Sequence, residues 1–98
     1  MVTTYQPMLH TTAERELQSL ESDDRDTLTE VLKDVATCES PTQHKKTKSL
    51  EGQDGLFRVR VRDMRAIVTL EKPHLKILKI GYRRKVYDSV DSIHERLA

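Results

Sequence analysis

Cysteine is nearly missing from this sequence, because Cys38 is the only one among its 98 residues. A single cysteine excludes an internal disulfide and a metal site built from several cysteines. Long apolar stretches are missing too, since no run approaches the ~20 residues that a membrane-spanning helix needs. The first ten residues have neither the basic start nor the apolar stretch of a signal peptide. We therefore expect one cytoplasmic domain with a modest core.

Histidine is sparse as well, and no two of the four histidines have metal-ligand spacing. We expect no metal and no other cofactor. What the sequence does contain is charge, in an uneven arrangement. Residues 1–43 hold three Lys/Arg and nine Asp/Glu, a charge of −6. Residues 44–87 hold thirteen Lys/Arg and four Asp/Glu, a charge of +9. Residues 88–98 hold one Lys/Arg and three Asp/Glu, a charge of −2. This asymmetry suggests a surface that faces a polyanion, the alternative being an ordinary solvated face that happens to be basic.

The first half of the sequence predicts a strand and two helices. Residues 2–9 have β-branched and aromatic side chains typical of a strand, and Pro7 either places that strand at a sheet edge or ends it there. Thr11 and Glu14 fit a capping box. An apolar helical face follows, formed by Ala13, Leu17 and Leu20. A second helix is expected to begin at Ser22, with Asp23, Asp24 and Asp26 near its start and an apolar stripe of Leu28, Val31, Leu32 and Val35.

The stretch "RVRVRDMRAIV" (58–68) predicts a hairpin with a definite register. With a two-residue turn at Asp63 and Met64, one face of the hairpin is entirely apolar. Directly opposed residues share a sheet face, so the other face gathers the basic side chains. A slip of one residue would mix the two faces. The four arginines expected on one surface are Arg58, Arg60, Arg62 and Arg65.

The remaining segments complete the expected order. We predict a polar loop at residues 42–48, a turn at 72–74, a strand at 75–82 and a C-terminal helix near 87–98. The inward face of the 75–82 strand stays ambiguous, because Leu75 and Ile77 lie opposite Leu78 and Ile80. The expected fold is α+β in one domain, residues 1–98: an N-terminal strand, a helical hairpin, an antiparallel sheet of three to four strands and a C-terminal helix.

This order, with the motifs "KSLEG", "GLFRVRVRDMRAIV" and "KILKIGYRRKVY", resembles the RelE/ParE superfamily of type II toxins, and the resemblance covers essentially the whole chain. RelE-like members are metal-independent, ribosome-dependent mRNA endonucleases that use the basic face of the sheet. The resemblance implies catalytic roles for Arg65, Arg83 and Tyr87. It implies RNA-binding roles for a larger basic set: Arg58, Arg60, Arg62, Lys46, Lys48 and Arg84.

The chemistry fits these residue types. Cleavage of RNA by its own 2′-hydroxyl needs positive charge around a phosphate that becomes more negative, and arginine forks suit that phosphate. Tyr87 would stack on a base or assist proton transfer. The general base stays open, because family members often have lysine where Arg58 and Arg60 stand. His44, Lys46 and Lys48 are the candidates for it, ahead of Tyr87.

Two functions follow from the resemblance. The first is a toxin that cuts mRNA in the ribosomal A site, contacts mRNA and rRNA, and is neutralised by a cognate antitoxin laid over the same sheet. The second is a ParE-like toxin that inhibits DNA gyrase by binding alone. Neither function implies a membrane or a small-molecule cofactor.

Overall fold

The computed structural model describes residues 5–38, 41–49 and 55–82. In chain order its elements are β1 (Gln6–Leu9), α1 (Thr11–Gln18), α2 (Ser22–Thr37), a short 3-10 turn (Pro41–Gln43), β2 (Thr47–Ser49), β3 (Phe57–Val61), β4 (Met64–Glu71) and β5 (His74–Tyr82). This is the α+β order expected from the sequence, with β2 as an addition. The expected C-terminal helix lies outside the described residues.

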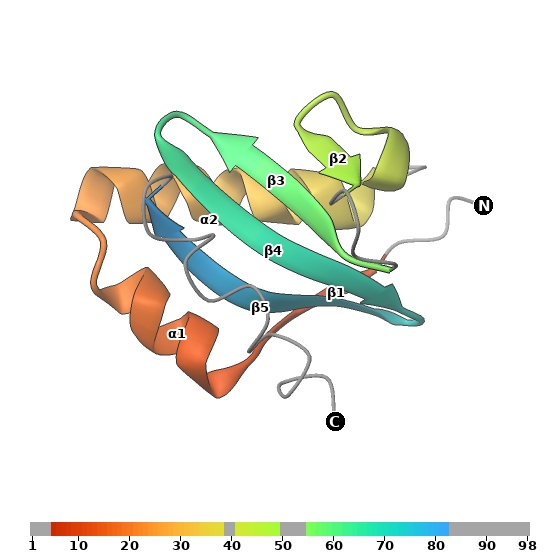
Figure 1. Cartoon of the computed structure of the whole chain (residues 1–98), viewed down its shortest axis with the longest axis horizontal. Coiled ribbons are helices and arrows are strands. Elements are labelled where there is room, and N and C mark those ends of the chain that lie inside the picture. Colours follow the sequence, from red (N-terminus) through yellow and green to blue (C-terminus); the bar gives the residue numbers. More distant parts are fainter. Residues whose placement is uncertain (1–4, 39–40, 50–54, 83–98) are drawn as a thin grey trace.

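The five strands form one mixed sheet in the order β1-β5-β4-β3-β2. The pairs from β2 to β5 are antiparallel, whereas β1 runs parallel to β5. The sheet stands in front of α2 in the view of Figure 1, with α1 beside β5. β1 is an edge strand, as Pro7 predicted, because a residue without an N–H cannot bond strands on both sides. The fold therefore has a helix-covered face and a second face turned away from α2.

The two helical stripes form the core with the covered face of the sheet. Ala13, Leu17 and Leu20 are buried as predicted, and so are Leu28, Leu32 and Val35, with Val31 half-buried against them. The expected capping box is wrong. His10 caps α1 instead, since its Nδ1 accepts a hydrogen bond from the Thr12 N–H at 3.2 Å. Helix α2 begins at Ser22 as expected, with the acidic residues Asp23 and Asp24 in its first turn.

The β3–β4 turn differs from the expected one. It consists of Arg62 and Asp63, so Val61 pairs with Met64 and Arg60 with Arg65. Each β3 residue therefore faces a partner two positions earlier than the sequence predicted. An even shift leaves every side chain on its own face, which is why the separation into an apolar and a basic face survives. Arg62 takes φ 55°, a left-handed conformation that is uncommon for arginine.

A bulge in β5 resolves the ambiguity of that strand. Lys79 pairs with Ile67, but the next β4 residue, Val68, pairs with Ile77, so Leu78 is the extra residue. The insertion reverses the alternation, and it lets Leu75, Ile77 and Ile80 all join the core. Leu78 and Ile67 are buried outside that cluster, on the other face.

Candidate nucleic-acid interface

The most charged feature of the described surface is a half-open hollow of about 590 Å³. All of its described lining residues are cationic. It lies along β2, β3 and the turns next to them. We call it the basic hollow, defined by Lys45, Lys46, Lys48, Arg58, Arg60 and Arg62.

Strand pairing brings these side chains together from two separate segments. Lys48 of β2 lies directly opposite Arg58 of β3, so the two side chains share one face. One step further, the Arg60 N–H donates to the Lys46 carbonyl oxygen at 2.8 Å. Like charges that face each other across strands destabilise a sheet. A bound anion would relieve that repulsion, which makes the hollow suited to a polyanion.

β2 was missed because its residues, Thr47–Ser49, are polar and fall in a lysine-rich stretch. The signal that was available is alternation. Thr47 is buried between the half-buried Lys46 and the exposed Lys48, as expected for a strand with one solvated face. Lys46 and Lys48 were predicted to bind RNA from a loop. Lys48 lies in β2, and Lys46 lies in the turn just before it, where its carbonyl oxygen is bonded to the Arg60 N–H.

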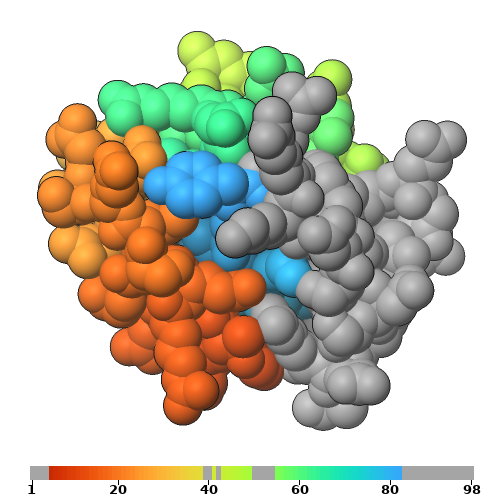
Figure 2. All heavy atoms as spheres, turned by 60° about the vertical axis from the view of Figure 1, so that its left-hand side comes forward, coloured from red at the N-terminus to blue at the C-terminus, as the bar shows by residue number. Residues whose placement is uncertain are grey.

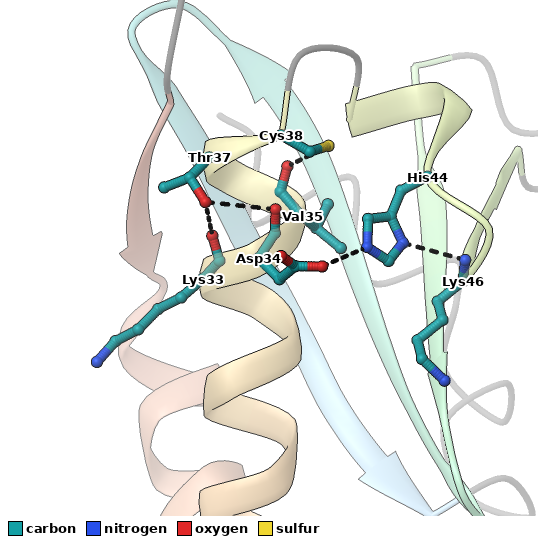
Figure 3. Close-up of polar contacts among 7 residues, drawn as sticks. All are labelled: Lys33, Asp34, Val35, Thr37, Cys38, His44 and Lys46. Carbon is teal, nitrogen blue, oxygen red and sulfur yellow. Dashed lines mark hydrogen bonds and ion pairs between the residues drawn. The ribbon is translucent and has the colours of Figure 1, made fainter.

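The His44 side chain holds the turn that leads into β2 (Figure 3). Its Nε2 lies 2.8 Å from Oδ2 of Asp34 in α2, and its Nδ1 accepts a hydrogen bond from the Lys46 N–H at 3.1 Å. Because Nδ1 is an acceptor, the neutral ring carries its proton on Nε2 and donates it to Asp34. Both ring nitrogens are therefore occupied. The geometry makes His44 a support for the lysine-bearing turn rather than a general base.

Arg65 occupies a different place from the other arginines. It shares a face with Arg60, but it is only 6% exposed. Its Nη1 donates to the carbonyl oxygens of Met64 at 2.8 Å and Arg62 at 3.1 Å. Arg65 thus stabilises the β3–β4 turn through hydrogen bonds to backbone carbonyl oxygens. It is not among the described lining residues of the basic hollow.

Arg62 stands at one end of the basic hollow and is paired with an acid. Its Nη1 lies 3.3 Å from Oδ1 of Asp24, which belongs to the first turn of α2. The other Asp24 oxygen accepts a hydrogen bond from the Tyr82 hydroxyl at 2.9 Å. This hydrogen bond, with desolvation and the negative charge of Asp24, raises the pKa of Tyr82 above its ordinary value of 10.0. Figure 2 shows β5 reaching the surface where it meets the helices and the β3–β4 hairpin.

The structure thus gathers Arg58, Arg60, Arg62, Lys46 and Lys48 of the predicted site, and adds Lys45. Arg83, Arg84 and Tyr87 lie outside the described residues, so their convergence with the hollow stays a prediction. Asp24 was predicted only as part of a helix start, and nothing in the sequence linked it to Arg62, which lies 38 positions later. Among residues 5–38, 41–49 and 55–82, no group of three or more His, Cys, Asp or Glu side chains is placed to hold a metal. No helix in this part of the chain is long and apolar enough to cross a membrane.

No protein-family model matches the sequence, and no curated protein matches it. Solved structures do match. A RelE–RelB complex from Pyrococcus horikoshii OT3 is 29% identical, with 85% of this chain and 99% of that chain covered at a TM-score of 0.67. The toxin–antitoxin complex RelBE2 from Mycobacterium tuberculosis is 25% identical, covering 85% and 94% at a TM-score of 0.69.

The chain has the RelE-like fold. A mutant of the E. coli toxin RelE in its free state has the same fold at 18% identity, covering 95% of this chain and 93% of that chain with a TM-score of 0.70. The resemblance expected from the sequence is therefore confirmed at the level of the fold. In this RelE-like sheet, the basic hollow lies on the face turned away from α2.

Proposed function

We propose that this protein is the toxin of a type II toxin–antitoxin system, and that it cleaves mRNA in the ribosomal A site and so inhibits translation. The basic hollow is the observation that carries the proposal, because six cations line one surface. The RelE-like fold supports it independently. Two of the matching structures, 25% and 29% identical, are complexes of a toxin with its antitoxin.

The hollow suits the phosphates of single-stranded RNA. Arg58 and Arg60 offer planar, permanently charged forks that match a phosphate in two places. Lys45, Lys46 and Lys48 act as point charges along the same strand pair. If each lining cation met one phosphate, log Kd would change by about 4 per tenfold change in salt concentration. Binding of this kind is strong in dilute salt and depends little on base sequence.

Cleavage needs groups beyond this positioning set. Following the resemblance, Arg65 and Arg83 would stabilise the negative charge on the phosphate as the 2′-oxygen attacks, and Tyr87 would orient the nucleotide. Arg65 donates to the Arg62 carbonyl oxygen and so fixes the backbone of a residue that lines the hollow, which gives Arg65 a structural role as well. Both ring nitrogens of His44 are hydrogen-bonded, so Lys46 and Lys48 remain as candidate bases. Lys46 is half-buried and Lys48 is exposed. A cognate antitoxin is the expected second partner.

Expression in a bacterial host tests the proposal. Induction of the wild-type chain should arrest translation and produce mRNA cut at ribosome-bound codons, mapped by primer extension. Arg60→Ala should reduce both effects. Lys33→Ala is the matched control, because it removes an equal charge from an exposed position on α2. Intact mRNA with DNA damage would refute cleavage and favour gyrase inhibition.

A further inference from the structure

Asp24 forms an ion pair with Arg62, one of the lining cations of the basic hollow. Its two oxygens are used by two other elements: Oδ1 by Arg62 of the β3–β4 turn and Oδ2 by Tyr82 at the end of β5. The Asp24 side chain is 22% exposed, whereas the Arg62 side chain is 56% exposed. The acid is therefore the fixed member of the pair and the arginine is the accessible one.

We propose that Asp24 is a built-in competitor of RNA: it pairs with Arg62 in the free protein, and an RNA phosphate takes its place when RNA enters the basic hollow. The proposal rests on the proposed function only in assuming that the hollow receives RNA. It makes Asp24 a regulator of affinity that touches no substrate. Without it, Arg62 would be fully available to phosphate, and RNA would bind more tightly, most of all in dilute salt.

The geometry allows this exchange without rearrangement of the fold. Arg65 donates to the Arg62 carbonyl oxygen at 3.1 Å, so the turn backbone is held in place. Only the Arg62 side chain has to move, and it already lines the hollow. Tyr82 keeps Asp24 in position by its 2.9 Å hydrogen bond, so the carboxylate does not follow the arginine. The Arg62 side of this ion pair is largely exposed, so solvent weakens the pair and a phosphate can replace the carboxylate.

The helix offers a matched control for the charge of Asp24. Asp23 lies in the same first turn of α2 and is exposed. Asp23→Asn and Asp24→Asn therefore change net charge equally and cost the helix the same favourable dipole interaction. Only Asp24→Asn removes the carboxylate that faces Arg62. A difference between the two variants reports the pairing itself.

Fluorescence anisotropy with a short labelled single-stranded RNA, titrated at several salt concentrations, tests the proposal on the full chain. Asp24→Asn should bind about three- to fivefold more tightly than Asp23→Asn, with a salt slope steeper by about 0.7. In an Arg62→Ala background the two asparagine variants should bind alike. Asp24→Ser is the second variant if Asp24→Asn melts early, because it removes the same carboxylate.

The variants distinguish a failure of the Asp24 role from a failure of RNA binding at the basic hollow. Suppose that Arg60→Ala weakens RNA binding relative to Lys33→Ala, but Asp24→Asn binds like Asp23→Asn. The competitor role of Asp24 is then wrong, and the basic hollow is still the RNA site. The role is equally wrong if the tighter binding of Asp24→Asn persists without Arg62. If Arg60→Ala and Lys33→Ala bind RNA equally, the hollow is not the RNA site and both ideas are overturned.

Discussion

The His44 ring makes two hydrogen bonds, one with the partly buried N–H of Lys46 and one with the exposed carboxylate of Asp34. Replacing His44 therefore tests how the turn that carries Lys46 is held. The His44 side chain is 10% exposed, while its partner Asp34 is 72% exposed. Figure 3 shows the ring between α2 and the turn that carries Lys46. His44→Ala removes the ring and leaves the Lys46 N–H without the Nδ1 acceptor. Asp34→Asn keeps an oxygen that can still accept the Nε2 proton.

The expected magnitudes follow from that contrast. Losing the acceptor of a partly buried N–H costs about 1–3 kcal/mol, and the lost packing of the ring adds about 1 kcal/mol. We therefore expect His44→Ala to lower the free energy of unfolding by about 2–4 kcal/mol. Asp34→Asn changes an exposed ion pair and should cost about 0–1 kcal/mol. For a domain of this size, each kcal/mol corresponds to about 4–8 °C in Tm.

Urea unfolding followed by circular dichroism measures these differences, with RNA affinity measured on the same samples. His44→Asn is the informative third variant, because its side-chain oxygen can replace Nδ1 as the acceptor for Lys46 and should restore part of the stability. His44→Ala should also weaken RNA binding, since Lys45, Lys46 and Lys48 depend on this turn. A stability loss for Asp34→Asn as large as that for His44→Ala would refute the reasoning.

Three further predictions concern the sheet and its charges. Lys48→Ala should flatten the salt slope of RNA binding by about 0.7, whereas Lys33→Ala should leave it unchanged; equal slopes would exclude Lys48 from phosphate contact. Arg65→Ala should lower the free energy of unfolding by about 2–4 kcal/mol, measured in urea, because two carbonyl oxygens lose a charged donor; an unchanged midpoint would contradict the bracing role. The raised pKa of Tyr82 means that the unfolded chain ionises first, so wild-type Tm should fall as pH rises above about 10. Tyr82→Phe should lack this part of the decline, and identical pH profiles would contradict the Asp24 contact.

Much of the fold could be predicted because apolar periodicity dominates it. The stripes of α1 and α2 and the alternation in β3 each concern residues close in sequence, where spacing alone decides which side is buried. The hairpin turn was placed wrongly because Arg62, a residue with no special preference for positive φ, takes the left-handed conformation. The bulge was equally hidden, since only pairing with β4 shows that β5 has one residue too many.

The candidate site could be predicted in its charges but not in its partners. The basic residues of the hairpin stand out in the sequence, and the structure does place three of them around one hollow. The burial of Arg65 and the pairing of Arg62 with Asp24 depend on contacts between distant segments. Like-charged side chains look equivalent in a sequence, and packing is what gives one a structural task and another an open surface.

The extra residue at Leu78 makes β5 tolerant of a change in length at one point. Deleting Leu78 would leave Ile77, Lys79 and Ile80 in ordinary alternation, with Ile80 still turned towards α1 and α2. Deleting Lys76, the residue between Leu75 and Ile77, would instead invert every position on one side of the cut relative to the other. Tyr82 would then swing away from Asp24 or the core would lose its aliphatic side chains. We therefore expect a functional variant of this chain with one residue fewer in β5 to lack Leu78.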